Sequence, residues 1–586
     1  MTLRLVLLTL GMGVVAAGAC SAAANNNPST GGGGSGGSGG DDISLTSGST
    51  GTMCETHCSA DLHSVVDCNG KMVSTCPVDQ GCSQGGCVPS CESAKENKST
   101  IGCDYYAVNP DNIPPYYTSC FAAFVANTWG APVTIQVERD GQTLDATSFS
   151  YLSQGTGQSI TYQPLPGGQL PPGQVAIVFL EHNGGSVVPC PPSVKAAQIL
   201  DPAVHGTGIG AAFHITTSAP VVAYDIFPYG GAEGGVTSAT LLLPTTAWDT
   251  NYIAVDAFRK SQAVAQGQPS IDIVAAEDGT EVTISPTAAI AAGPGVAPTE
   301  QGQPQTYHLD KGQFLQLTQD AELTGSPIQA NKPVGVWGGA SCLSVDIDVS
   351  ACDTAHQQIP PVKALGSEYV AVRYRNRFDG QEESPPWRMV GAVKGTTLTW
   401  EPSQPPNAPS TLDVGQIAEF RAPGPFTVKS QDVDHPFYMS AYMTGCEELN
   451  PAHDDCRGDP EFVNVIPSLQ YLSSYVFFTD PTYPETNLVL VRRNDGDGFK
   501  DVTLDCAGKL TGWQPIGSGG KYEYTRIDLV RDFQPQGSCD NGRHEIHSDA
   551  PFGLVVWGWN EGGSYAYPAG TGVQPINTVE VLPIPK

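Results

Sequence analysis

The feature that most restricts the possible folds of this chain is a fourfold repeat that begins near residue 103 and runs to the C-terminus. In three copies a proline is followed eight residues later by a tyrosine and an apolar run, at Pro244–Val255, Pro361–Val372 and Pro467–Phe478. Tyr105 opens the first copy without the proline. The copies are ~110 residues long, which is the size of a β-sandwich and well above the ~40–45 residues of a propeller blade.

A second marker is a proline that opens a short apolar stretch late in each copy, at Pro220, Pro333, Pro436 and Pro551. Proline has no amide hydrogen for the strand ladder, so the first position of a strand is where it costs least. The chain also contains 67 glycines and 48 prolines, a composition that disfavours long helices and suits short strands joined by tight turns. We predict an all-β fold of about four tandem β-sandwich-like repeats after a small disulfide-rich module. A closed, propeller-like ring of the four units is the alternative.

These patterns divide the chain into seven segments. The predicted boundaries are 1–19 for a lipoprotein signal peptide, 20–53 for a lipidated cysteine and flexible Gly/Ser linker, 54–102 for a Cys-rich module, and 103–240, 241–358, 359–464 and 465–586 for the four β-repeats.

The first twenty residues predict export and lipid attachment. Arg4 precedes the apolar run Leu5–Leu10, and small residues lead to Cys20, an arrangement that resembles a bacterial lipobox. We therefore expect Cys20 to carry a lipid that anchors the protein in the cell envelope, at the outer membrane or cell surface of a Gram-negative bacterium. Signal cleavage without lipidation is the alternative. Residues 21–53 offer little apolar surface to bury and predict a flexible tether with a reach of ~30 Å.

Cysteine usage agrees with export. Of 17 cysteines, an even number remains once Cys20 is assigned to the lipid, and disulfides are the expected state outside the cytoplasm. Eight lie between Cys54 and Cys103, in a segment too poor in large apolar residues to fold around a core alone. A disulfide scaffold is the prediction for this module, and a zinc site is the alternative.

The repeat alignment also predicts which of the remaining cysteines pair. Two cysteines follow the Pro-led stretch at nearly the same offsets in the second and third copies, as expected if the two members of each pair touch. The predicted bridges are Cys342–Cys352 and Cys446–Cys456. Elimination within the first and fourth copies adds Cys120–Cys190 and Cys506–Cys539. Each of the two short loops should gain under ~3 kcal/mol from its bridge.

A formal net charge of −31 argues against nucleic acid or anionic lipid as a partner. Acidic residues gather in the two short Cys-closed loops, and carboxylate oxygens are the ligands that Ca²⁺ prefers. Weak calcium candidates are Asp346, Asp348, Asp353, Asp454 and Asp455. A solvated acidic rim is the alternative, and no other cofactor is expected.

The sequence offers no arrangement that we would assign to catalysis, so we predict that the chain is not an enzyme. Gly-x-Ser-x-Gly occurs only among the linker glycines, without the strand and helix of a nucleophile elbow. His544 and His547 lie three residues apart, so on a strand they would face opposite sides and share no metal.

Several segments resemble the N-terminal domain of the IgG Fc-binding protein family, including bacterial lipoprotein members with a Cys-rich N-terminal segment. These segments are Ile271–Ile284, Leu323–Trp337, Gln358–Val370 and Ala550–Trp559. The resemblance implies an extracellular binding or adhesion module over about residues 103–586, with a protein or glycan partner. It supplies no binding residues that transfer one by one. A self-associating structural component of the cell envelope is the alternative, and a secreted enzyme of unrecognised type is the second alternative.

Overall fold

The computed structural model describes residues 56–583, except residues 60, 69, 183–184, 234, 346–351 and 451–454. The predicted signal peptide, Cys20 and the whole predicted linker lie outside the described residues. Strands hold 48% of the residues and helices 6%, which confirms the all-β prediction. Within the described ranges no helix is long and apolar enough to cross a lipid bilayer.

The Cys-rich module is a set of short strands and one helix joined by disulfides. Its elements are β1 (His57–Cys58), β2 (Ser64–Val66), β3 (Met72–Thr75), β4 (Gln80–Ser83), β5 (Gly86–Pro89) and α1 (Ser90–Asn97). The disulfides are Cys58–Cys82, Cys76–Cys87 and Cys91–Cys103, the last of which ties α1 to the first repeat. Cys68 is also disulfide-bonded. The sulfur atoms of these cysteines are therefore in disulfides and are not free to bind zinc.

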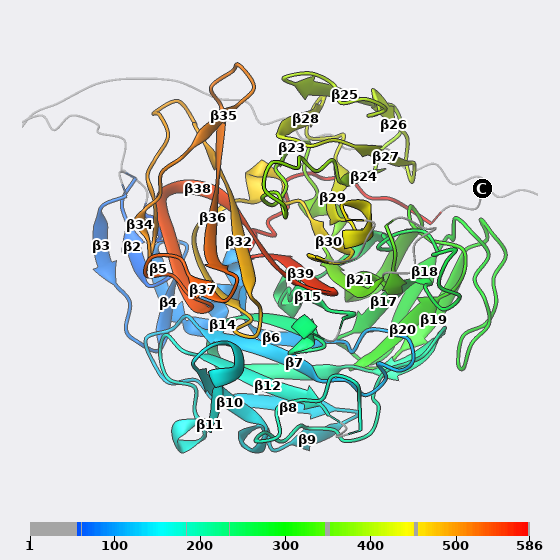
Figure 1. The fold of residues 1–586 in the computed structure, drawn as a ribbon, viewed down its shortest axis with the longest axis horizontal. Coiled ribbons are helices and arrows are strands. Elements are labelled where there is room, and N and C mark those ends of the chain that lie inside the picture. Colours follow the sequence, from blue (N-terminus) through cyan, green and yellow to red (C-terminus); the bar gives the residue numbers. More distant parts are fainter. Residues whose placement is uncertain are drawn as a thin grey trace, which may run out of the picture. The chain divides into compact units, whose positions relative to one another are not determined.

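The second repeat shows how each unit is built. Its strands are β16 (Asp249–Ile253), β17 (Pro269–Ala275), β18 (Thr280–Ile284), β19 (Gln305–Leu309), β20 (Gln313–Thr318), β21 (Pro327–Leu343) and β22 (Asp353–Ile359). The long strand β21 belongs to two sheets: its first half pairs with β16 and β18, and its second half pairs with β17 and β22. The unit is therefore a sandwich whose two sheets share one bent strand (Figure 1).

The first and fourth repeats follow the same plan, whereas the third has two separate sheets and no shared strand. The first contains β6 (Ile101–Ala107), β7 (Phe121–Asn127), β8 (Ile135–Arg139), β9 (Gln142–Leu144), β10 (Ser150–Gln154), β11 (Thr161–Pro164), β12 (Val175–Glu181), β14 (Phe213–Phe227) and β15 (Ser238–Leu241), and β13 (Gly208–Ala211) joins the sheet of the second repeat. The third contains β23 (Glu368–Ala371), β24 (Pro386–Gly391), β25 (Thr396–Glu401), β26 (Thr411–Leu412), β27 (Ile417–Arg421), β28 (Phe426–Ser430), β29 (Phe437–Met443) and β30 (Glu461–Asn464). The fourth contains β31 (Leu472–Thr479), β32 (Glu485–Arg493), β33 (Val502–Leu504), β34 (Gly508–Lys509), β35 (Gln514–Ile516), β36 (Tyr522–Arg531), β37 (Gln534–Pro535), β38 (Gly542–Asn560) and β39 (Gly563–Pro568).

One buried tyrosine ties the two ends of each repeat together. In the second repeat Tyr252 Oη donates to the carbonyl oxygen of Val334 at 2.7 Å and accepts from the amide of Asp249 at 3.1 Å. The carbonyl belongs to the residue directly after the marker Pro333. The corresponding pairs in the other repeats are Tyr105 with Val221, Tyr369 with Phe437 and Tyr475 with Phe552. The tyrosine and proline markers of the sequence therefore occupy equivalent positions in all four units.

Burial differs between the two sheets of a repeat. In the second repeat, β18 alternates buried and more exposed residues, whereas every residue of β17 is buried. An antiparallel sheet with one wet face shows the first pattern, and a sheet covered on both faces shows the second. The sheet that contains β17 is thus covered by its own repeat on one face and by a neighbour on the other.

Neighbouring repeats share hydrophobic cores. Trp248 and Trp337 of the second repeat pack into the core of the first, and Val390 and Tyr438 of the third pack into the core of the second. Trp557 and Trp559 of the fourth repeat do the same in the third. A fourth core combines the first repeat with the last. There the rings of Phe124 and Phe478 lie 4.8 Å apart. The units are sandwiches, as predicted, and they also close into a ring.

After β39 the chain runs across several repeats. The amides of Gly572, Val573 and Ile576 donate to the carbonyl oxygens of Gln470, Lys98 and Lys363. Farther on, the amide of Val581 donates to Asn251 Oδ1 at 2.8 Å. We call residues 569–583 the strap, because this segment bonds to the fourth repeat, the end of α1, the third repeat and the second repeat in turn.

Candidate functional site where four loops converge

One strand from each repeat lies at the place where the four units meet. These inner strands are β15, β22, β30 and β39, which pack against one another (Figure 1). Each follows the Pro-led strand of its repeat. The connecting segments, 228–237, 344–352, 444–460 and 561–562, therefore come from all four units. We call the described part of these segments, together with the first residues of the inner strands, the loop face.

Hydrogen bonds across repeats hold the loop face together. The amide of Ser564 donates to Asp353 Oδ2 at 3.1 Å, and its hydroxyl accepts from the amide of Asp459 at 2.9 Å. Ser238 Oγ donates to Glu461 Oε1 at 3.3 Å. Because these residues begin or precede inner strands of different repeats, the four connecting segments start from one bonded cluster.

Disulfides close two of the four segments. The structure joins Cys342 to Cys352 and Cys446 to Cys456, with Cα–Cα distances of 5.2 and 5.1 Å. It also joins the two further pairs that the sequence suggests, Cys120–Cys190 and Cys506–Cys539. The first two bridges limit the conformations that the ends of their loops can adopt.

A buried arginine braces the third-repeat segment a second time. Arg377 has almost no exposed surface and pairs with Glu383 Oε2 at 2.9 Å. Its guanidinium donates to the carbonyl oxygens of Thr444 at 2.7 Å and Arg457 at 2.9 Å. One rigid, planar group thus fixes both ends of segment 444–460.

The calcium candidates of the sequence do not form one site among the described residues. Asp346, Asp348 and Asp454 lie outside those residues. Asp455 is exposed and accepts from Arg457 Nε at 3.0 Å. Asp353 is buried at the start of β22, and burial raises its pKa well above the usual value, with further contributions from Asp459 and Glu461. Asp353 is therefore part of the interior support of the loop face.

Other side chains of metal-ligating type are already engaged. Within the described ranges, two groups of such side chains come together, and each contains a disulfide-bonded cysteine. In one of them His544 Nδ1 lies 3.0 Å from Asp505 Oδ1, and its Nε2 lies 2.7 Å from the carbonyl oxygen of Asp540. On β38, His544 is buried and His547 is exposed, so the two rings face opposite sides of the strand.

Sequence patterns gave no sign of a buried pair below the loop face. His356 Nε2 on β22 lies 2.5 Å from Asp225 Oδ1 on β14, and both side chains are inaccessible. Burial raises the pKa of Asp225, and the adjacent His356 opposes that shift. The two residues are 131 positions apart. They meet only because two repeats are in contact, so no local sequence motif indicates that they pair.

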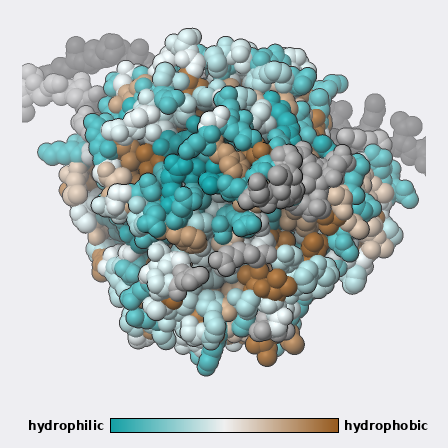
Figure 2. Space-filling view, in the orientation of Figure 1, coloured by the Kyte–Doolittle hydropathy of each residue, from teal (hydrophilic) through white to brown (hydrophobic). Residues whose placement is uncertain are grey.

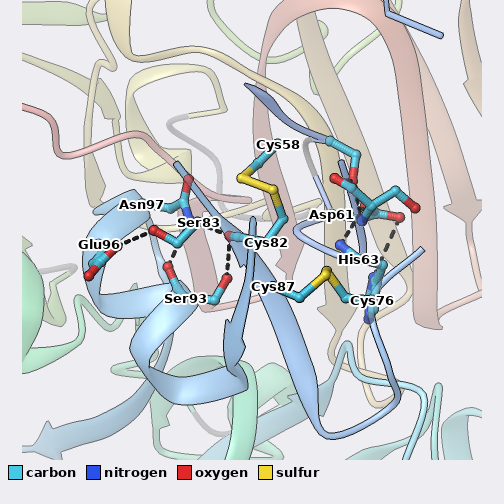
Figure 3. Close-up of a disulfide and its surroundings, with 12 residues drawn as sticks. Cys58, Asp61, His63, Cys76, Cys82, Ser83, Cys87, Ser93, Glu96 and Asn97 are labelled. Atoms are coloured by element: carbon cyan, nitrogen blue, oxygen red, sulfur yellow. Dashed lines mark hydrogen bonds and ion pairs between the residues drawn. A yellow bond between two sulfur atoms is a disulfide. The ribbon is translucent and has the colours of Figure 1, made fainter. Parts of the chain in front are cut away.

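A second candidate is a cavity of about 200 Å³ between the Cys-rich module and the first and fourth repeats. Asp61, His63 and Glu545 line it together with hydroxyl and apolar side chains. The His63 ring packs on Trp129 at 4.3 Å, and its Nδ1 lies 3.5 Å from Asp61 Oδ2. The hydrogen bond from His63 lowers the pKa of Asp61. Figure 3 shows this pair beside the disulfides Cys58–Cys82 and Cys76–Cys87.

The fold and the loop face together define a class: a disulfide-braced β-repeat protein in which one connecting segment from each of four units meets the others. The family profile described as "IgGFc binding protein" matches residues 238–558, more than half of the chain. The chain belongs to this family.

The human IgGFc-binding protein is 24% identical over 355 residues. The aligned stretch covers 60% of this chain but 6% of the human protein. No solved structure matches the chain.

Proposed function

We propose that the protein is a lipid-anchored cell-surface protein of the bacterial envelope whose loop face binds an extracellular protein or glycan. The observation that supports this most is the convergence of four connecting segments, one from each repeat, two of them closed by disulfides. Loops whose ends are fixed to a rigid scaffold lose less entropy on binding than unrestrained ones, and binding sites are often built this way.

The charge and polarity of the protein suit a polar partner. Asp455 and Glu448 are exposed on the loop face, and the whole chain carries a net charge of −31. Hydrophilic residues predominate on the side drawn in Figure 2, with hydrophobic ones in small groups. A partner with positive charge at its contact surface would associate faster with such a protein. Immunoglobulin, which the name of the human relative mentions, is one protein to include among the partners tested.

The test is capture of partners from host or environmental fluids by the full chain, followed by variants of the loop face. Glu448→Lys and Asp455→Lys should lower capture at least tenfold, because they reverse charge on the proposed surface. Asp140→Lys, at an exposed hairpin between β8 and β9, is the matched control and should capture as the wild type does. Equal capture by all three variants would contradict the assignment of the loop face.

A self-associating envelope component is the second candidate, and the same experiment separates it from the first. Concentration-dependent oligomers of the purified chain, without a captured partner, would favour it. The proposed anchor has its own test: Cys20→Ser should move the protein from the detergent phase to the soluble fraction. Unchanged membrane association of that variant would show that Cys20 does not anchor the protein.

A further inference from the structure

We call the contact region between two neighbouring repeats a seam. The seam between the first and second repeats contains a buried aspartate without a cationic partner. Asp272 lies in the middle of β17 and is 4% exposed. In register it is opposite Gln316 on β20. Residues directly opposite each other on antiparallel strands point to the same face of the sheet, so the two side chains lie together.

The first repeat contributes a second carboxylate to this place. Gly206 connects the two sides: its carbonyl oxygen accepts from Gln316 Nε2 at 2.7 Å, and its amide donates to Asp111 Oδ2 at 3.0 Å. Asp111 is also buried. Burial, followed by the negative charge of Asp111, raises the pKa of Asp272 well above its usual value. The two carboxyl groups therefore act on each other across the seam.

Two oxygen atoms at this place receive no hydrogen bond from the described part of the chain. They are Asp272 Oδ1 and Gln316 Oε1, both inaccessible. The Gln316 amide cannot simply turn, because its Nε2 donates to the carbonyl oxygens of both Val204 and Gly206. A buried acceptor without a partner is destabilising, so two at one place indicate a missing electropositive group.

The next seam shows what the fold places at the equivalent position. Asp272 is opposite Trp337, four residues after Pro333, and Arg388 of β24 is opposite Ser440, four residues after Pro436. The Arg388 guanidinium contacts both carboxylate oxygens of Glu322 at 2.9 Å, and its Nε lies 3.6 Å from Glu419 Oε2. Between the second and third repeats, a fixed cation therefore neutralises the carboxylates.

The first seam has an aspartate where that arginine stands. His205 is the cationic group nearest to Asp111 and is held by Asp111 and Asp201, at 3.2 and 2.8 Å. Within the described ranges, no lysine, arginine or histidine forms an ion pair with Asp272. At the first seam, Asp272 and the Gln316 amide oxygen therefore stand without a cation in the position where the next seam has Arg388.

We propose that a divalent cation of the calcium type binds at this seam, with Asp272, Asp111 and the Gln316 amide oxygen as protein ligands. Carboxylate and amide oxygens are the ligands that Ca²⁺ takes, and extracellular calcium sites work at Kd values of about 10⁻⁴–10⁻³ M. The ion joins the first and second repeats as Arg388 joins the second and third. This site is separate from the acidic loops and from the loop face.

The test measures calcium binding and thermal stability of the full chain after removal of divalent ions. Calorimetric titration should find a site that Asp272→Asn weakens at least tenfold, and Ca²⁺ should raise the Tm of the wild type but not of that variant. Asp455→Asn, at the exposed loop candidate, is the matched control and should keep both the binding and the Tm shift.

A charge substitution gives a readout that does not depend on loss of binding. Asp272→Arg should fold without calcium and show no calcium-dependent Tm, because it places a guanidinium at the position equivalent to that of Arg388. If the Asp272 carboxyl is instead neutral and donates to Gln316 Oε1, chelation will leave the wild-type Tm unchanged and no ion will bind. That result, or calcium binding that Asp455→Asn removes and Asp272→Asn does not, would overturn the proposal.

Discussion

Buried carboxyl groups occur at the seams between repeats, and burial changes the pH at which they ionise. Asp256 accepts hydrogen bonds from the amide of Leu323 at 2.8 Å and the hydroxyl of Thr324 at 3.0 Å. Burial, with a contribution from Glu322, raises the pKa of Asp256 to about 8, although these bonds and Arg388 oppose the shift. The folded protein therefore keeps a proton on Asp256 that the unfolded chain releases above about pH 4.

This retained proton predicts a pH-dependent difference between the wild type and Asp256→Asn. Between about pH 4 and 8 the unfolded state binds fewer protons at this position, so the free energy of unfolding of the wild type falls as pH rises. Asparagine has no such proton and its side-chain oxygen can accept the same bonds. We expect similar stabilities near pH 4 and a growing advantage of the variant, of the order of 1 kcal/mol per pH unit, towards pH 8. Urea denaturation at several pH values measures this, and parallel pH profiles would contradict it.

The bridging and buried polar residues of this protein were only partly predictable from its sequence. The pairing of Cys342 with Cys352 follows from positions that recur in two copies. Asp225 and His356 have no such signal, because each has its partner in a neighbouring repeat, 131 residues away along the chain. Asp353 was visible as one acid in an acidic stretch, but its burial depends on the inner strands of other repeats.

At the scale of elements, the buried tyrosine is the contact that fixes the Pro-led strand of each repeat. Tyr252→Phe keeps the ring but leaves the Val334 carbonyl and the Asp249 amide without their partner inside the protein. We expect a loss of about 1–3 kcal/mol in the free energy of unfolding, measured by urea denaturation. Tyr524→Phe removes a partly buried bond to the Gln514 side chain and should cost less. Equal losses for the two variants would mean that the tyrosine does not brace the repeat.

The existence of these elements was predictable, but the contacts between them were not. A proline at the start of a strand and a tyrosine eight residues after another proline are local patterns, so they mark the ends of the unit. Tyr252 and Val334 are 82 residues apart, and the hydrogen bond between them becomes evident only when the sheet is formed.

At the scale of the whole molecule, the four repeats share their cores and should unfold together. A chain of independent sandwiches would show several transitions, whereas units that each bury their neighbours' aromatic residues lose those contacts at the same time. We expect one calorimetric transition for the full chain, with a calorimetric enthalpy close to the van't Hoff enthalpy. Several resolved transitions would show that the seven-segment division also describes independent folding units.

The sequence did not distinguish a closed ring of repeats from an open tandem array, for a physical reason. Repeat length and strand patterns report how one unit folds, and they are the same for an open array and a closed ring. Closure depends on Phe124 meeting Phe478, and on the Tyr224 hydroxyl lying 3.0 Å from the carbonyl oxygen of Val476 and 2.6 Å from that of Ala569. These contacts join the first and last copies, and they do not appear in the repeat pattern of the sequence.

The strap has a consequence for the order in which the protein matures. A chain leaves the ribosome from its N-terminus, so residues 569–583 emerge after all four repeats. Until they do, the carbonyl oxygens of Lys98 and Lys363 and the Asn251 side chain lack the amides that bind them. Likewise, the face of the first repeat that contains Phe124 is covered only after the fourth repeat has been synthesised. The nascent protein is therefore exposed to chaperones and proteases until residues 569–583 have been synthesised, and chains that stop before residue 569 should be degraded.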